Sequence, residues 1–314
     1  MVQSAALLMQ KNAANGHPPP SPMPLTPMVM RGNCRNALCV VRPPGHHAGV
    51  QGLIPGSTSC GFCVFNSVMV GAAHALQGPL RVPRVAIVDF DVHHGDGSEE
   101  IVRALHRAHS LPPNALFFCS IHLYDPGDAS FGAFYPGSGA ADDLSANVLN
   151  VPVAPLWRKS AIGKGGGGRP SVILGGSAPG ASPKCACWGC GRAEWRSAFS
   201  QRVLPALRAF GPDLLLLSSG FDGGLGDIGN SKLDDKEKYH QGLDLSAADF
   251  EWATEQLVSV AAICCPGKVV SVLEGGYGNY EATRDTESGY TVSRAGLAEN
   301  VGAHLSALAG VNPR

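Results

Sequence analysis

The chain has 314 residues, and its 24 Lys and Arg residues nearly balance its 25 Asp and Glu residues, which gives a net charge of −1. This near-zero charge argues against broad electrostatic binding to nucleic acid or to an anionic membrane surface. The ten cysteines follow no recognisable secretory signal, and no run of about 18 apolar residues predicts a membrane span. We therefore expect an intracellular, reduced protein with free thiols.

Two stretches hold much of the chain's 40 glycines and 24 prolines. Residues 1–33 include the proline-rich run 16–22 and show no helix or strand period, so they are interpreted as a flexible leader. Residues 159–193 include four consecutive glycines and predict a surface insertion that builds no core. This insertion carries three cysteines without a fourth metal ligand at normal spacing, namely Cys185, Cys187 and Cys190. The expected folded domain is residues 34–314.

Six short apolar runs predict buried strands, because both alternating faces of each run are mostly apolar, as in parallel strands covered by helices on each side. In chain order they are Ala37–Val41, Val85–Asp91, Ala115–Ile121, Val148–Val153, Leu214–Gly220 and Lys268–Gly275. Helix patterns are found at Cys63–Gln77, Ser98–His109, Ala193–Phe210, Ser246–Cys264 and Val292–Ala309. The alternation predicts an α/β fold with a doubly wound, mainly parallel sheet flanked by helices.

Nearly every predicted strand runs into polar residues at its carboxyl end. The clusters are Arg42–His47, Asp89–Gly97, Ser120–His122, Ser218–Asp222 and Glu274–Gly278. Open parallel sheets bind ligands at the carboxyl ends of their strands. We therefore expect these clusters, which lie far apart in the sequence, to converge on one site.

A metal site is predicted from three of these polar residues. Asp91 and His93 are two residues apart at a strand end, so both side chains point to the same side. Asp222, at the end of another strand, is the candidate third ligand. Two carboxylates and one imidazole leave positions open for water and substrate, as catalytic zinc requires. The imidazole favours zinc over magnesium, and iron and cobalt remain chemically allowed.

The tandem pair His46-His47 is a candidate base and acid, with Asp89 and Asp96 as residues that orient the two imidazoles. Tyr277, in a turn flanked by glycines, is a candidate hydrogen-bond donor to a carbonyl oxygen that becomes an oxyanion. A lone histidine or tyrosine is more often structural, so the prediction depends on their joint presence at strand ends.

Together, these motifs resemble the zinc-dependent histone deacetylase family, and more closely its class II branch. They occur in the family's order, and the set is far more specific than any one short motif. The matching segments are Arg42 to Ala48, Gly61-Phe62-Cys63 with Asn66, Asp89 to Gly97, Phe134 to Gly139, Asn150-Val151-Pro152, Gly220-Phe221-Asp222 and Leu273 to Tyr277.

The resemblance implies an arginase/deacetylase-like fold, a catalytic Zn²⁺ and hydrolysis of N-acetyl-lysine side-chain amides on histones or other proteins. It implies that Asp91, His93 and Asp222 ligate the zinc. It also implies that His47, paired with Asp96, is the general base and acid.

The remaining roles are implied in the same way. His46, paired with Asp89, resembles the electrostatic partner of the base, and Tyr277 the residue that polarises the acetyl carbonyl. The acyl-lysine tunnel would be formed by Gly61, Phe62, Tyr135 and Gly275. A structural monovalent cation, K⁺, would be bound mostly through backbone oxygens of Asp89, Asp91, His93, Ser120 and Ile121.

The chain also departs from the family pattern, because only 45 residues precede His46. We expect the first strand and one wall of the tunnel mouth to be missing. Two alternatives to protein deacetylation stay open: an acetylpolyamine deacetylase, which an acidic residue at the tunnel rim would favour, and an inactive deacetylase-like scaffold. The family further implies acetylated histone tails or other acetyl-lysine proteins as partners, a corepressor complex, and a place in the nucleus or cytoplasm, with no direct contact to nucleic acid or membrane.

Overall fold

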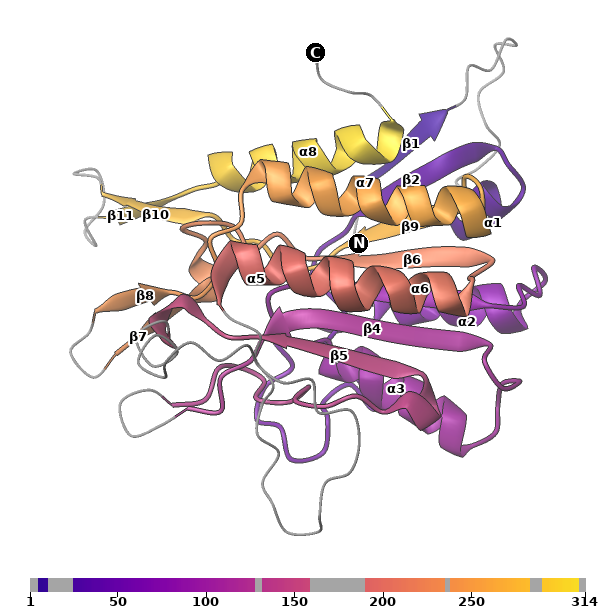
Figure 1. Cartoon of the computed structure of the whole chain (residues 1–314), viewed down its shortest axis with the longest axis horizontal. Coiled ribbons are helices and arrows are strands. Elements are labelled where there is room, and N and C mark those ends of the chain that lie inside the picture. The colour runs from indigo at the N-terminus through magenta and orange to yellow at the C-terminus, as the bar shows by residue number, and fades with distance from the viewer. Residues whose placement is uncertain are drawn as a thin grey trace.

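The computed structural model describes residues 5–10, 25–127, 132–158, 190–234, 238–282 and 290–310 (Figure 1). A seven-stranded sheet forms the centre, in the order β1-β2-β9-β6-β3-β4-β5. Six strands are parallel, and β1 pairs antiparallel with β2 at the edge. The strands are β1 (Ala5–Gln10), β2 (Cys34–Val40), β3 (Val85–Asp89), β4 (Leu116–Leu123), β5 (Val148–Val153), β6 (Leu214–Ser219) and β9 (Val269–Leu273). The predicted fold class is confirmed.

Helices cover both faces of the sheet. One layer holds α5 (Gly191–Ala198), α6 (Leu204–Phe210), α7 (Ala247–Cys264) and α8 (Ala295–Ala309), and the other holds α1 (Leu25–Met30), α2 (Ser67–Gln77) and α3 (Asp96–Arg107) (Figure 1). A π-helical turn, η3 (Phe199–Val203), joins α5 to α6. Short 3₁₀ turns lie at η1 (Leu144–Ala146), η2 (Leu156–Arg158) and η4 (Ile228–Asn230).

The apolar runs form strands because the sheet is buried on both sides. All five residues of β3 and all six of β6 are buried. Along β3, Ala86 and Val88 belong to the core beneath α5 to α8, whereas Val85 and Ile87 belong to the core beneath α1 to α3. The period of two residues along a strand thus supplies two separate cores from one sheet.

Side-chain caps begin two of the helices: α7 starts at its predicted position, whereas α2 starts four residues after the predicted Cys63. The side chain of Asn66 accepts a hydrogen bond from the Met69 backbone N–H at the start of α2. Ser246 and Asp249 form a reciprocal capping box at the start of α7. Both caps satisfy backbone N–H groups that have no partner within the helix.

Some elements differ from the sequence prediction. Residues 1–33 were expected to lack regular structure, yet 5–10 form β1 and 25–30 form α1. Two antiparallel hairpins were also not predicted, namely β7 (Ser231–Leu233) with β8 (Tyr239–Gln241), and β10 (Asn279–Ala282) with β11 (Tyr290–Ser293). Of the proposed insertion, residues 159–189, with Cys185 and Cys187, lie outside the described residues.

The strand register brings the polar clusters together. Asp89, the last residue of β3, is paired with Ser218 on β6 and with Ser120 on β4. The segments that follow β2, β3, β6 and β9 therefore leave the sheet at the same edge. In the part of the chain that the structure describes, no helix is both long and apolar enough to cross a membrane.

Candidate metal centre and acid–base site

Asp91, His93 and Asp222 form a compact cluster at the carboxyl edge of the sheet. Their ligand atoms all lie within 4.8 Å of one another. His93 Nδ1 lies 3.1 Å from an Asp91 oxygen and 3.2 Å from an Asp222 oxygen. The Phe134 ring stacks on the imidazole of His93 at 5.2 Å between ring centroids and so fixes its plane. The structure thus brings the three predicted ligands together.

The backbone supports both carboxylates of this cluster. Gly275 N–H donates to Asp91 Oδ2 at 2.7 Å, and Val92 N–H donates to Asp222 Oδ1 at 3.0 Å. A β-carbon at Gly220 would overlap the Asp91 carboxylate, and one at Gly275 would overlap that of Asp222. Glycine is therefore required at both places, because the backbone passes directly over the carboxylates.

The charges of the cluster suit a divalent cation. Asp222 Oδ2 is buried and faces His93 Nδ1 at 3.2 Å. Burial and the charge of Asp91 raise the pKa of Asp222. Burial alone would lower the pKa of His93, but hydrogen bonds to Asp222 and Asp91 raise it to about 9. Two buried carboxylates around one imidazole nitrogen are unfavourable without a positive charge between them. Their oxygen and nitrogen donors fit zinc.

Each histidine of the tandem pair is oriented by its own aspartate. His46 Nδ1 lies 2.9 Å from Asp89 Oδ2, and His47 Nδ1 lies 2.7 Å from Asp96 Oδ1. The carboxylates accept these bonds, so Nδ1 of each ring carries the proton and Nε2 of each ring is left for other contacts. The predicted pairing of His46 with Asp89 and of His47 with Asp96 is present in the structure.

The two adjacent imidazoles are held in opposite protonation states. Burial would lower the pKa of His46, but Asp91, Asp89 and Glu274 together raise it well above its ordinary value. For His47, burial and the neighbouring positive charge of His46 lower the pKa to about 3, although Asp96 opposes this. The arrangement therefore holds one charged and one neutral imidazole, with ring centroids 4.0 Å apart, beside the metal cluster.

Tyr277 completes the site from the turn after β9. It is half-buried, and burial together with the charges of Asp222 and Asp91 raises the pKa of its phenol. The hydroxyl therefore stays protonated and able to donate. Asp227 accepts hydrogen bonds from Tyr277 N–H at 3.0 Å and Gly278 N–H at 2.8 Å, which fixes this glycine-flanked turn.

Two aromatic side chains predicted as tunnel walls stand beside these groups. The Tyr135 ring lies 5.0 Å from the His47 ring, and its hydroxyl donates to the Ser59 carbonyl at 3.0 Å. Phe62 lies 6.2 Å from the Tyr277 ring and is 73% exposed. Its φ of 65° is unusual for a bulky residue. A β-carbon at the preceding Gly61 would overlap the His47 imidazole, so the wall approaches the base closely.

The candidate site lies within a segment that matches a known protein family. Residues 22–292 match the model of the histone deacetylase domain. The chain belongs to the histone deacetylase family.

Relatives within this family cover most of the chain. It is 33% identical over 80% of its length to type-2 histone deacetylase 2 of Dictyostelium discoideum and 31% identical over 79% to histone deacetylase 15 of Arabidopsis thaliana. Human histone deacetylase 7 is 35% identical over 77% of the chain. The chain spans only 12%, 34% and 20% of these three proteins, respectively. The crystal structure of the HDA15 HD domain matches with a TM-score of 0.59 and 26% identity, over 92% of this chain and 60% of that one.

Two acidic residues at the candidate site were given no role from the sequence. Glu274 and Asp227 are buried, and each accepts bonds from two consecutive backbone N–H groups at the site. An acidic residue beside a glycine-rich turn was the available signal. The predicted K⁺ site remains a prediction, although strand pairing does place Asp89 beside Ser120.

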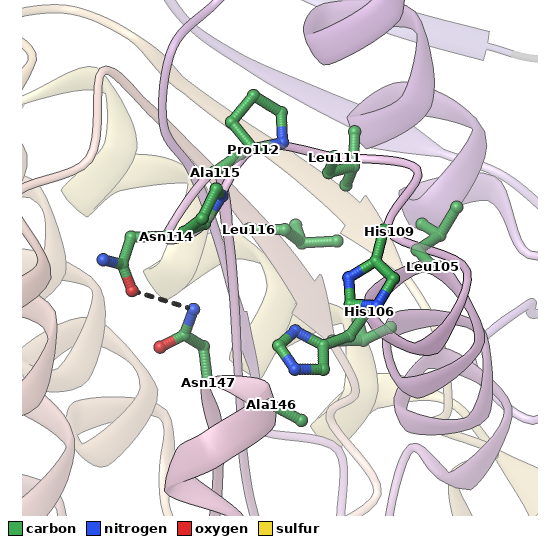
Figure 2. Close-up of a pocket in the computed structure, with 12 residues that line it drawn as sticks. Leu105, His106, His109, Leu111, Pro112, Asn114, Ala115, Leu116, Ala146 and Asn147 are labelled. Atoms are coloured by element: carbon green, nitrogen blue, oxygen red, sulfur yellow. Dashed lines mark hydrogen bonds between the residues drawn. The ribbon is translucent and has the colours of Figure 1, made fainter.

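A separate cavity of about 290 Å³ lies at the opposite, amino-terminal end of the strands (Figure 2). It is bounded by the end of α3, the start of β4 and the turn before β5, and its lining includes Leu105, His106, His109, Leu116 and Asn147. Neither the metal cluster nor the tandem histidines line this cavity. It is therefore distinct from the candidate deacetylase site.

Proposed function

We propose that this chain is a zinc-dependent hydrolase that removes acetyl groups from N-acetyl-lysine side chains of histone tails or other proteins. Membership of the histone deacetylase family supports deacetylase chemistry. One observation supports the finer proposal: a three-ligand metal cluster, two His–Asp pairs and a protonated tyrosine all meet at one sheet edge.

Zinc would be held by Asp91, His93 and Asp222. When bound there it supplies a Lewis acid that lowers the pKa of water and polarises a carbonyl group. The backbone N–H groups of Gly275 and Val92 keep the two carboxylates in place for this role.

Proton transfer belongs to the tandem histidines. Because His47 Nδ1 is hydrogen-bonded to Asp96, its neutral Nε2 accepts the proton of the attacking water. The same nitrogen returns that proton to the lysine amine when the amide C–N bond breaks, which leaves acetate and a free lysine side chain. The charged His46 imidazole, held by Asp89, stabilises negative charge on the reacting carbonyl oxygen.

Tyr277 donates its hydroxyl hydrogen bond to the same carbonyl oxygen as negative charge develops on it. Phe62 and Tyr135 form the apolar walls along which the acetyl-lysine side chain reaches the site, with Gly61 and Gly275 giving the close backbone approach. A K⁺ ion bound near Asp89, Ser120 and Ile121 would stabilise the strand ends that carry these groups. We further propose that the protein acts in the nucleus or cytoplasm, within a corepressor complex.

The test combines metal analysis with product analysis. The purified chain is expected to bind about one zinc per molecule and to release acetate from an acetyl-lysine peptide, and a chelator should abolish this activity until zinc is restored. Asp222→Asn should lose both the zinc and the activity, because it removes one ligand charge. Zinc-loaded wild-type protein that releases no acetate would contradict the proposal, as would full activity in Asp222→Asn.

A further inference from the structure

Glu274 is a buried carboxylate at the site that belongs neither to the metal cluster nor to a His–Asp pair. It follows β9 directly, and its side chain is 0% exposed. Burial, offset in part by the charge of His46, raises its pKa to about 7. A carboxylate removed this completely from water requires specific partners.

The partners of Glu274 are on the turn that carries the tandem histidines. Its Oε2 accepts hydrogen bonds from the N–H groups of Gly45 at 2.7 Å and His46 at 3.1 Å. Its Oε1 accepts a bond from the hydroxyl of Ser218, at the end of β6, at 3.1 Å. One side chain thus ties β9 and β6 to a turn about 230 residues earlier in the chain.

The rest of this turn has little freedom of its own. The His46 carbonyl accepts from Ser98 N–H at 3.0 Å, and His47 N–H donates weakly to Cys63 Sγ at 3.4 Å. A β-carbon at Gly45 would overlap the Phe65 carbonyl, so the turn is packed against its neighbour. Without Glu274, two consecutive buried N–H groups would lose their acceptor, and the backbone would have to move to satisfy them.

A second metal site is a different reading of the same residues, because Glu274, His46 and Cys63 offer ligand atoms within 4.8 Å of one another. The geometry disfavours it. The Glu274 oxygens already accept three hydrogen bonds, and His46 Nδ1 is bonded to Asp89. Burial raises the pKa of Cys63 to about 12, so its sulfur remains a thiol and a poor metal ligand.

We propose that Glu274 is a positioning residue that fixes the Gly45-His46 backbone and thereby aims His47 at the substrate amide. This inference rests on the proposed deacetylase function. It predicts that what matters is the acceptor oxygen rather than the negative charge.

The test compares Glu274→Ala, which removes the acceptor, with Glu274→Gln, which keeps an oxygen for the two N–H groups and can donate to Ser218. Acetate release from an acetyl-lysine peptide gives kcat and KM, and bound zinc is measured on the same samples. The alanine variant should lose about a hundredfold in kcat, the effect of misplacing a catalytic group by about 1 Å. Its KM and zinc content should match wild type, and glutamine should restore most of kcat.

Asp249→Asn is the matched control, since Asp249 is also a buried carboxylate, but its hydrogen-bond partners are Ser246 and Arg196 rather than residues of the site. It should lower stability and leave kcat unchanged. Where the alanine variant does not fold, Glu274→Met fills a similar volume without an acceptor and should show the same loss.

Several outcomes would overturn the positioning role. They are wild-type kcat in a folded variant without the acceptor, a loss confined to KM or zinc binding, a glutamine variant as impaired as alanine, or failure of both alanine and methionine variants to fold. By contrast, a zinc-loaded wild-type chain without activity would contradict the proposed function itself, so the two failures are distinguishable.

Discussion

The two ends of the parallel sheet offer a comparison within one molecule. At the carboxyl end, Asp91, Asp222 and Glu274 lie buried beside the tandem histidines. At the amino end, a cavity of about 290 Å³ is lined by apolar side chains, two histidines and two asparagines, with no acidic side chain in its lining (Figure 2). The amino end thus has a cavity without acidic side chains, whereas the carboxyl end has the side chains that could bind a metal and transfer protons.

The two ends differ in whether the surrounding backbone stabilises buried negative charge. Backbone N–H groups of the turns after β2, β3 and β9 point at the carboxylates, which makes buried negative charge tolerable there. The cavity at the amino end is instead bounded by the C-terminus of α3, which is the negative end of the helix dipole and disfavours negative charge. A cavity therefore identifies a reaction site only when the groups around it can hold and move charge.

Among substitutions that leave the metal ligands intact, Tyr277→Phe should lower kcat the most. Removing one hydroxyl that donates to the developing oxyanion should lower kcat by about a hundredfold to a thousandfold. Zinc content should not change, because Tyr277 is not a ligand in the cluster. Steady-state acetate release with metal analysis provides the check, and near-normal kcat would remove Tyr277 from the reaction.

A smaller loss is expected from Asp96→Asn. The amide no longer fixes His47 with its proton on Nδ1, so the fraction of imidazole with a free Nε2 falls. By analogy with residues that orient metal-bound histidines, activity should fall about tenfold to a hundredfold. A variant with unchanged activity over the whole pH range would show that Asp96 does not orient the base.

His304 lies at neither end of the sheet, and it is expected to affect the pH dependence of stability. Burial lowers its pKa to about 3, and its ring nitrogens contact the hydroxyls of Thr254 on α7 and Ser271 on β9, with Phe90 and Phe221 beside the ring.

The sign of the pH dependence follows from this lowered pKa. Below the unfolded-state pKa of about 6.5, the unfolded chain binds a proton that folded His304 cannot, so stability falls as the pH drops toward 3. The contribution is at most about 1.4 kcal/mol per pH unit. Urea unfolding between pH 7 and pH 4.5 should show a shallower loss for His304→Gln, and identical slopes would contradict the prediction.

The smallest effect is expected at the amino-end cavity. His109 has a φ of 48° just after α3, where its N–H bonds to the His106 carbonyl and the Ser110 N–H bonds to the Leu105 carbonyl. This is a Schellman motif in which glycine is the preferred residue. His109→Gly should raise the free energy of unfolding by about 0.5–1 kcal/mol and leave acetate release unchanged. Loss of activity would mean that the two ends of the sheet are coupled.

Much of the fold was predictable because burial on both faces leaves a strong signal in the sequence. β5 has the predicted bounds Val148–Val153, and the other five predicted strands agree to within about three residues at each end. The hairpins β7–β8 and β10–β11 gave no such signal. Their strands are short, and they carry exposed residues such as Tyr239, Tyr280 and Tyr290. The one predicted helix over Ala193–Phe210 contains a π-helical turn that apolar periodicity does not reveal.

The metal-binding residues of the site were predictable from the sequence. The residues that hold the site's turns in place were less so. Asp91, His93 and Asp222 have side chains whose chemistry suggests a metal wherever the strands converge. Glu274 and Asp227 act through backbone N–H groups of turns distant in sequence, and such contacts depend on tertiary geometry. The opposite pKa shifts of His46 and His47 likewise come from burial and from neighbours brought in by other strands.

The strand order sets when the site can exist during synthesis. β9 lies between β2 and β6, so β2 can join the centre of the sheet only after residues 269–273 have emerged. Asp222 follows β6, and Glu274 and Tyr277 follow β9. Asp91 and His93 can therefore contact all of these residues only after more than half of the chain has been synthesised behind them. A ribosome-bound chain stopped before β9 therefore lacks the hydrogen bonds that secure both the ligands and the base. Assembly of the complete site therefore follows the synthesis of β9.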